Sequence, residues 1–217
     1  MFKLENVCYK YKKGTMNVLK NVCAEMTEGK VHAVMGPSGS GKTTLLSIMA
    51  GLDRPTSGQV LLNGEDIAGT DLDRYRRESV SMIFQAFQLF PLLTALENVC
   101  FPLEMLGVLK TDATKRAKEL LASVGIDEAK AARHPSNLSG GEQQRVAIAR
   151  ALSTGAKVLL ADEPTGNLDG ANTDAVVEIL RHLAHNEGYC VIIVTHNPEI
   201  AEVADVTMRM RDGVLSV

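Results

Sequence analysis

The chain has 217 residues, which is enough for one sizeable apolar core or for one domain with an insertion. Its hydrophobic content of 45% and charged content of 23% are those of an ordinary globular protein. Its net charge of -3, from 23 basic and 26 acidic residues, gives no electrostatic footprint for nucleic acid and argues against DNA- or RNA-binding proteins. Its cysteines show no CxxC pair or metal-ligand spacing, which favours reduced thiols. No segment has eighteen uninterrupted apolar residues, so we expect no membrane span.

Two kinds of strand are predicted along the chain. Residues 2–8 and 18–26 alternate in the manner of antiparallel strands, and Gln59–Leu62 adds another, so we expect an antiparallel meander. A second pattern, apolar throughout and followed by a turn and a helix, occurs at HAVMG (32–36), VLLAD (158–162) and VIIVT (191–195). Such runs are typical of strands buried on both faces of a parallel sheet. The chain is therefore expected to be an α/β protein, with the meander beside a parallel sheet.

The strongest motif in the first third of the chain is GPSGSGKT, residues 36–43. It fits G-x-x-x-x-G-K-[ST] and stands between a predicted strand and a helix, a context that disfavours a chance glycine-rich turn. In such a loop backbone N–H groups converge on a phosphate, Lys42 adds positive charge and Thr43 offers a hydroxyl to Mg²⁺. The motif predicts a P-loop NTPase core. The predicted nucleotide-binding residues are Gly36, Pro37, Ser38, Gly39, Ser40, Gly41, Lys42, Thr43 and Thr44.

A helical segment without strands is predicted from about residue 87 to residue 137. Thr94, three residues before Glu97, predicts a capping box, and Thr111 is expected to cap a helix that stops near Gly125. We interpret the segment as a helical subdomain inserted into an α/β core. That core would comprise residues 1–86 and 138–217, so that residues 1–217 form a single domain.

The stretch NLSGGEQQRVAIARAL (137–152) turns abruptly from a glycine pair into a helix. Ser139 stands three residues before Glu142, which predicts a second capping box. A helix N-terminus that begins with glycines has accessible backbone N–H groups and is suited to binding a phosphate. This helix has no lysine, however, and the chain already has a complete phosphate-binding loop. The residues therefore raise the question of which anion this second site binds.

Polar residues follow the two later apolar runs. Asp162 and Glu163 stand at the carboxyl end of a buried strand, where α/β proteins place ligand groups, although both could merely cap the next turn. In the functional interpretation Asp162 holds Mg²⁺ and Glu163 acts as a general base toward water. His196 ends the run VIIVT and Gln85 follows the strand-like VSMIF. Each of these two residues is by itself more typical of a structural or surface position.

Together these segments resemble the ATP-binding subunit of an ABC transporter, over almost the whole chain. The resemblance rests, in family terms, on Walker A (GPSGSGKT), the Q-loop (Gln85), the signature (LSGGEQQR), Walker B with the catalytic glutamate (VLLADE), the D-loop (NLD, 167–169) and the switch histidine (His196). Walker A alone is also found in GTPases and kinases. The six motifs in this order identify the chain as a member of the ABC-type ATPases.

The resemblance implies ATP and Mg²⁺ as cofactors, with Mg²⁺ near Thr43, Gln85 and Asp162. It implies catalytic roles for Glu163, His196 and Gln85. Tyr11 stands where the family places an adenine-stacking aromatic residue, and Tyr9 remains the alternative.

The resemblance also implies a homodimer in which two subunits meet head to tail around two ATP molecules. Ser139, Gly140 and Gly141 would then bind the γ-phosphate that Lys42 of the other chain holds. This arrangement answers the question of the second anion site, because a signature without a lysine becomes useful only when ATP brings charge to it.

Three segments resemble one branch of the family: LDRPTSG (52–58), FPLLTALENV (90–99) and ADEPTGNLD (161–169). The branch includes lipoprotein-release, macrolide-export and antimicrobial-peptide-resistance ATPases and the FtsE-like ATPases of cell division. It implies a separate integral membrane permease, of the FtsX- or MacB-like type, driven from the cytoplasmic face of the cell membrane. The output would be transport or transmitted force.

Other functions within the same superfamily fit less well. ABC-type ATPases that act on DNA carry a long coiled coil or further domains between the motifs, and the insertion here is short and has no basic stripe. Ribosome-acting relatives resemble two such domains in one chain, and one set of motifs is present here. Replacement of Glu163 or His196 would favour a nucleotide-regulated binding module that does not hydrolyse ATP. Both residues are present, which argues against such a module.

An apolar group surrounds the junction between Gln85 and the helical segment. Its members are Phe84, Phe87, Leu89, Phe90, Leu92 and Leu93. They could pack in the core, or they could form an apolar cleft for a short cytoplasmic helix of the permease. The pattern of the residues leaves both interpretations open.

Overall fold

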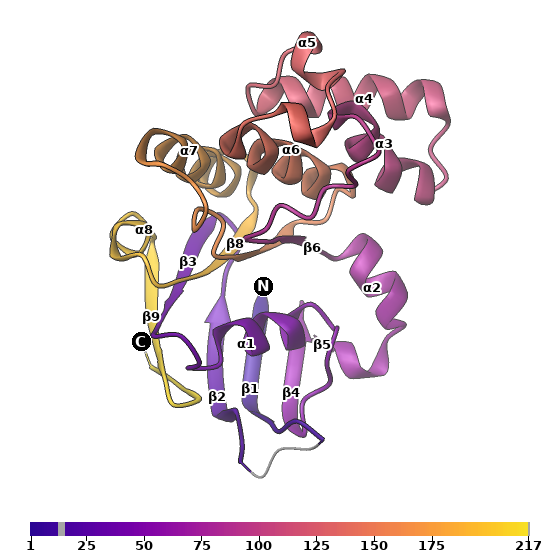
Figure 1. The fold of residues 1–217 in the computed structure, drawn as a ribbon. Coiled ribbons are helices and arrows are strands. Elements are labelled where there is room, and N and C mark those ends of the chain that lie inside the picture. The colour runs from indigo at the N-terminus through magenta and orange to yellow at the C-terminus, as the bar shows by residue number, and fades with distance from the viewer. Residues whose placement is uncertain (13–15, 217) are drawn as a thin grey trace.

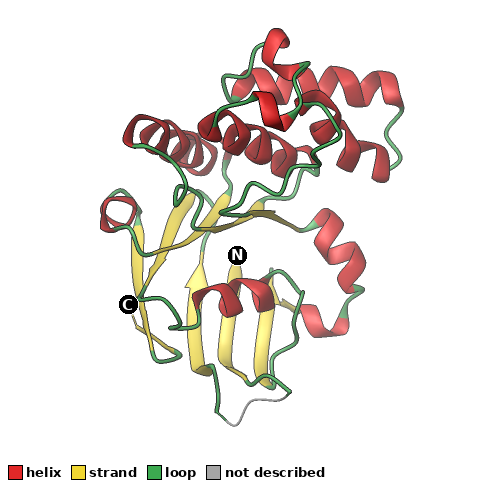
Figure 2. Ribbon diagram, in the orientation of Figure 1, coloured by secondary structure: helices red, strands yellow, loops and turns green. Residues whose placement is uncertain are grey.

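The computed structural model describes residues 1–12 and 16–216, and the strands of this part of the chain form two sheets (Figures 1 and 2). The larger, sheet B, has the order β10-β9-β3-β8-β7-β6; the strands from β9 to β6 run parallel, and β10 is antiparallel to β9. The strands are β3 (Lys30–Met35), β6 (Val80–Ile83), β7 (Val158–Asp162), β8 (Cys190–Thr195), β9 (Val206–Arg211) and β10 (Val214–Ser216). The three apolar runs are confirmed as parallel strands.

The smaller sheet, sheet A, is antiparallel and has the order β2-β1-β4-β5. Its strands are β1 (Phe2–Tyr9), β2 (Leu19–Met26), β4 (Ser57–Leu62) and β5 (Glu65–Asp66). The predicted antiparallel strands are confirmed. Their order differs from an uninterrupted meander, because the chain crosses to sheet B after β2, forms β3 and α1 (Lys42–Met49), and returns to pair β4 with the other edge of β1.

Two apolar clusters cover the two faces of sheet B. Along β8, Val191 and Ile193 belong to one cluster and Ile192 and Val194 to the other, because successive side chains of a strand point to opposite faces. The second cluster also contains the buried side chains of α1 and of sheet A. The first cluster is shared with α3 (Ala95–Met105), α4 (Lys110–Ser123), α6 (Gly140–Ser153) and α7 (Gly170–Glu187).

The remaining helical elements are short: η1 (Ile67–Gly69), α2 (Leu72–Glu78), α5 (Glu128–Ala131), η2 (Pro135–Asn137) and α8 (Pro198–Glu202). Figure 1 shows α3, α4 and α5 gathered with α6 on one side of sheet B. Leu103 of α3 and Leu121 of α4 belong to the same cluster as Val31 of sheet B, so the helical segment has no separate core. Within the residues that the structure describes, no helix is both long and apolar enough to cross a membrane.

The N-termini of three helices, α3, α4 and α6, can be compared with the predicted helix caps. Both capping boxes are confirmed, Thr94 with Glu97 at α3 and Ser139 with Glu142 at α6. The predicted cap at Thr111 is wrong, because α4 begins at Lys110 after Leu109, without a side-chain cap. The physical reason is the short connection: α3 is followed by Gly107 in the left-handed region (φ 83°), and only two residues separate that turn from the next helix.

Candidate active site

The carboxyl ends of β3, β7 and β8 open into a cavity of about 850 Å³. Parallel pairing sets Met35 opposite Thr195 and Asp162 opposite Val194, so that the loops after these strands emerge at one edge of the sheet. The cavity is lined by Tyr11, Val18, Pro37, Ser38, Gly39, Gly41, Lys42, Thr43, Thr44, Gln85, Asp162, Glu163 and His196.

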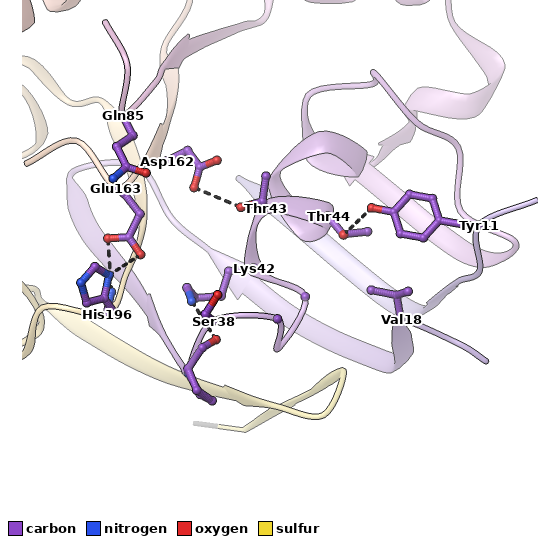
Figure 3. A pocket seen from close by; sticks show the side chains of 13 residues that line it. Tyr11, Val18, Ser38, Lys42, Thr43, Thr44, Gln85, Asp162, Glu163 and His196 are labelled. Carbon is purple, nitrogen blue, oxygen red and sulfur yellow. Dashed lines mark hydrogen bonds and ion pairs between the residues drawn. The ribbon is translucent and has the colours of Figure 1, made fainter. Parts of the chain in front are cut away.

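Figure 3 shows how these side chains are distributed. Tyr11 lies at one end of the cavity, Glu163 and His196 lie at the other, and Lys42 and Thr43 lie between them. The structure therefore brings the predicted Walker A, Walker B, glutamine and histidine residues around one space, although they come from distant parts of the chain.

Glycine sets the shape of the loop between β3 and α1. Gly39 (φ 78°) and Gly41 (φ 109°) adopt the left-handed backbone that residues with a Cβ rarely adopt. A Cβ at Gly36 would overlap the carbonyl oxygen of Met210 in β9, so this position needs glycine for close packing. Helix α1 begins directly after Gly41 without a side-chain cap, which leaves the N–H groups of its first turn available to an anion.

Lys42 lies against its own loop. Its Nζ donates to the carbonyl oxygens of Gly36, at 2.7 Å, and Pro37, at 3.1 Å, and the residue is 8% exposed. The lysine charge is thus held at the centre of the cavity, where the phosphates of a nucleotide would replace carbonyl dipoles as its partners. Gly36 and Ser40 of the motif do not themselves line the cavity; Ser40 Oγ is buried and, among the described residues, has no hydrogen-bond partner.

Thr43 and Asp162 meet across the cavity floor. The hydroxyl of Thr43 donates to Oδ1 of Asp162 at 3.3 Å. Burial raises the pKa of Asp162, and the like charge of Glu163 adds to the effect, so a cation at this point would relieve both costs. Hydroxyl, carboxylate and amide oxygens are the ligands that Mg²⁺ prefers, and Gln85 lines the same cavity. The residues present therefore fit a magnesium ion bound together with a nucleotide.

Glu163 has a strained backbone and a fixed carboxylate. It adopts the left-handed region (φ 47°), which costs a residue with a Cβ of order 1 to 3 kcal/mol. Thr195 Oγ1 donates to its Oε2 at 3.2 Å, and His196 Nδ1 lies 2.8 Å from its Oε1. Glu163 and His196, the two predicted catalytic residues, are thus in direct contact. Thr195 and His196, at the end of β8, fix the orientation of the carboxylate.

Gln85 reaches the cavity from the loop after β6. Its backbone carbonyl accepts a hydrogen bond from Asn167 Nδ2 at 2.9 Å, and its side chain lies against Gly166. The segment NLD therefore contacts the glutamine within the same chain. Sequence reasoning did not foresee this contact, because the two residues are 82 positions apart.

The structure separates the two tyrosines. Tyr9 is buried in sheet A, whereas Tyr11 is half exposed, lines the cavity and joins its hydroxyl to Thr44 Oγ1 at 2.9 Å. The rings meet edge to face, with centroids 5.0 Å apart. Val18, which also lines the cavity, was missed, because a single valine before a strand carries no local signal of ligand binding.

The signature residues lie apart from this cavity. Ser139, Gly140 and Gly141 form the start of α6 and are not among the residues that line the cavity. A Cβ at Gly141 would overlap the side chain of Asn172 in α7, whereas a Cβ at Gly140 would meet only ordinary contacts at 3.7 Å. Gly141 is therefore also needed within its own chain.

Known proteins resemble this chain in sequence and in fold. The family model described as "ABC transporter" matches residues 19–166. The lipoprotein-releasing system ATP-binding protein LolD of Geobacter metallireducens is 47% identical over 201 residues, which cover 91% of this chain and 89% of that protein. The uncharacterized ABC transporter ATP-binding protein YclH of Bacillus subtilis is 38% identical over 217 residues, 100% of this chain and 96% of that protein.

Solved structures agree. The dimeric structure of MJ0796, described as a bacterial ABC transporter cassette, is 40% identical and has a TM-score of 0.90, covering 99% of this chain and 96% of that one. The same protein is also known as a dimer in a post-hydrolysis state bound to ADP and Pi, with the same TM-score. The family match spans more than half of the chain and includes the P-loop and the signature. The chain therefore belongs to the ABC transporter family and is an ATP-binding, ATP-hydrolysing subunit of it.

Proposed function

We propose that the chain works as a homodimer that hydrolyses ATP to drive a separate integral membrane permease. The observation that carries the proposal is the division of the nucleotide-binding groups. One chain supplies a cavity with Lys42 at its centre, while Ser139–Gly141 lie outside that cavity at a helix start. A head-to-tail pair would bring the signature of each chain to the ATP of the other. The dimeric structure of the MJ0796 cassette supports the formation of a dimer.

In the proposed reaction a water molecule attacks the γ-phosphorus of ATP, the bond to the bridging oxygen breaks, and ADP and phosphate leave. Glu163 accepts the proton of the attacking water, and the histidine that contacts its Oε1 keeps the carboxylate in place. Gln85 orients the water. Lys42 stabilises the negative charge on the β- and γ-phosphates.

Two further parts of the cavity would bind the nucleotide. Tyr11, at the end of the cavity remote from Glu163, would stack on adenine. Thr43, Gln85 and Asp162 would hold Mg²⁺, which supplies charge neutralisation at the phosphates when bound. Residues 1–217 would act as a single nucleotide-binding domain, with residues 87–137 as its helical subdomain.

An apolar cleft of about 360 Å³ between the loop after β6 and the helices is the proposed docking site for the permease. Leu92 is 87% exposed and Phe90 42% exposed, whereas Leu89 packs against the first apolar cluster. Core packing therefore explains Leu89 but not Leu92. Phe84 and Phe90 line the cleft and Leu92 does not, but Leu92 follows Phe90 by only two residues. Exposed apolar side chains at and next to a cleft suit a short amphipathic helix of a partner.

The type of permease is proposed from the relatives. LolD is named as part of a lipoprotein-releasing system, and this chain is 47% identical to it. We propose an FtsX- or MacB-like permease and a peripheral position at the cytoplasmic face of the cell membrane.

Purification of the tagged chain from its native membranes tests the proposal. We expect a single integral membrane protein to co-purify, to be identified by mass spectrometry as an FtsX- or MacB-like permease, and to raise the ATPase rate. A different permease would overturn the proposed branch. A folded chain that hydrolyses ATP and retains no membrane protein would overturn the permease coupling itself.

A further inference from the structure

The loop that follows Gln85 has a strained backbone. Phe87 (φ 57°) and Gln88 (φ 49°) are consecutive residues in the left-handed region, which is unfavourable for residues with a Cβ. Such a conformation persists only where the surrounding structure holds it. Within the loop, the N–H of Phe87 donates to the carbonyl oxygen of Phe84 and that of Gln88 to the carbonyl oxygen of Ala86. Neither residue is a glycine, so we expect further restraint from other parts of the chain.

Arg150 of α6 supplies that restraint. Its Nη1 donates to the carbonyl oxygen of Gln88 at 2.6 Å and its Nη2 donates to that of Phe87 at 3.1 Å. One planar guanidinium thus binds both strained residues, with the fork geometry that arginine alone provides. The carbonyl oxygens of two successive left-handed residues converge on a single charged group.

The surroundings of Arg150 favour a dedicated role. Burial lowers the pKa of its guanidinium, and within the described residues no carboxylate lies within ion-pair distance of it. Its Cζ also lies 5.9 Å from the centroid of the Phe90 ring. A half-buried charge without an acidic partner depends on these neutral groups, so the arginine and the loop stabilise one another.

Other side chains hold the two ends of the loop, and Leu89 packs against the first apolar cluster, whereas the carbonyls of Phe87 and Gln88 are held by Arg150. Asn167 binds the carbonyl of Gln85, and the fully buried Asn98 binds the backbone of Phe90 on both its N–H and its carbonyl. Residues between these anchors are at least partly exposed. Loss of Arg150 would therefore free the segment directly beside Gln85 without unfolding the helices around it.

We propose that Arg150 is a positioning residue for ATP hydrolysis, which acts by holding the carbonyls of Phe87 and Gln88 and thereby the side chain of Gln85 at the cavity. The inference rests on the proposed role of Gln85. Because Arg150 and Phe90 also line the apolar cleft, the same contact gives a bound permease helix a physical route to Gln85.

Arg150→Met tests the proposal, because it keeps the length of the side chain and removes both hydrogen bonds. We expect kcat of the isolated chain to fall about 10- to 100-fold, since small misplacements of a catalytic group have effects of this size. KM for ATP should stay within about two-fold, because Tyr11, Lys42 and Thr43 are untouched and only Gln85 is displaced. Arg150→Lys should recover part of kcat. Arg74→Met, an exposed arginine of α2 paired with Glu78, serves as the control and should keep the parental kcat.

Two readouts separate positioning from a general loss of structure. Arg150→Met should speed hydrogen exchange at the amides of residues 86–90 and leave that of α4 unchanged. In a Gln85→Ala background, Arg150→Met should lower kcat by less than about two-fold. If Arg150 acts only by positioning the side chain of Gln85, its replacement has little further effect once that side chain is removed.

The outcomes are distinct. Parental kcat in Arg150→Met, unchanged exchange at residues 86–90, or an equal fold-loss in the Gln85→Ala background would each overturn the inference. Parental kcat in Gln85→Ala alone would instead overturn the proposed role of Gln85.

Discussion

His196 Nδ1 lies 2.8 Å from Oε1 of Glu163, at the end of the cavity that faces away from Tyr11 (Figure 3). The glutamate side chain is 14% exposed and the histidine side chain 68% exposed, so a mostly buried carboxylate is held by a ring that is open to solvent. The hydroxyl of Thr195 holds the second carboxylate oxygen. The two contacts therefore fix the orientation of the carboxylate relative to the cavity, as is required of a group that accepts a proton in a defined geometry.

The first prediction concerns this carboxylate. Glu163→Gln should keep ATP binding and lower the rate of hydrolysis at least roughly 10²-fold, because a general base contributes that much or more. It should also yield an ATP-bound dimer that is stable enough to be seen by size-exclusion chromatography. Glu199→Gln, in an exposed glutamate of α8, is the control and should hydrolyse ATP at the parental rate. Turnover of Glu163→Gln within a few-fold of the parent would rule out the proposed base.

The second prediction tests whether the signature acts on the ATP of the partner. Lys42→Ala removes the charge from one phosphate loop and leaves the signature intact. Gly140→Asp does the reverse, because it sets a carboxylate where a γ-phosphate must approach. Gly140 is preferable to Gly141 for this test, since a side chain at Gly141 would overlap Asn172 within its own chain.

Each of these homodimers should be inactive, whereas a mixture should regain activity. Random pairing makes about half of the dimers mixed, and each mixed dimer has one intact site, so about a quarter of the parental ATPase activity should return. Affinity-tagged pull-down must confirm that mixed dimers form. Confirmed mixed dimers that neither close on ATP nor hydrolyse it would contradict the shared site.

The third prediction concerns Phe90, which lines the apolar cleft, and the exposed Leu92 that follows it in the chain. Leu92→Ala should change the free energy of unfolding by less than about 0.5 kcal/mol, because the side chain is almost fully exposed. Leu92→Ala and Phe90→Ala should both leave the affinity for ATP unchanged and weaken co-purification of the permease. Leu121→Ala is the contrasting variant: its buried side chain should cost about 2 to 5 kcal/mol and leave coupling per folded molecule intact. Loss of stability in Leu92→Ala and Phe90→Ala with unchanged co-purification of the permease would favour core packing for these two residues.

The fourth prediction concerns the cysteines. Burial raises the pKa of Cys190 to about 12 and also raises the pKa of Cys100, whereas Cys23 is exposed and Cys8 half-buried. Because the thiolate is the reactive form, Cys190 and Cys100 should react with a thiol reagent at pH 8 only after unfolding. We expect two fast thiols in the native chain and four in denaturant. Cys23→Ser should remove one of the fast thiols; rapid labelling of Cys190 in the native chain would show that the core opens readily.

Much of the architecture follows from local patterns. The continuous apolar runs predicted β3, β7 and β8, since a strand buried on both faces needs no polar alternation. The two capping boxes predicted the starts of α3 and α6, because the partners of a cap are only three residues apart. The phosphate loop was readable for the same reason: its glycines, lysine and threonine are neighbours in the chain.

Contacts between distant segments had no such local signal. The return of β4 to the free edge of β1, the place of Val18 at the cavity and the overlap that keeps Gly141 a glycine each depend on residues that only folding brings together. The same holds for Arg150, which looks like any surface arginine of an amphipathic helix until two strained carbonyls are found at its guanidinium.

The sequence by itself determined which chemical groups this protein has and at which strand ends they stand, because strands, caps and phosphate loops are built from residues within a few positions of one another. Only the tertiary structure decided how those groups face each other: that His196 holds Glu163, that Tyr11 rather than Tyr9 reaches the cavity, and that the signature lies outside the cavity of its own chain. These relationships depend on how sheets and helices pack around a shared core, and packing is a property of the whole chain rather than of any one segment.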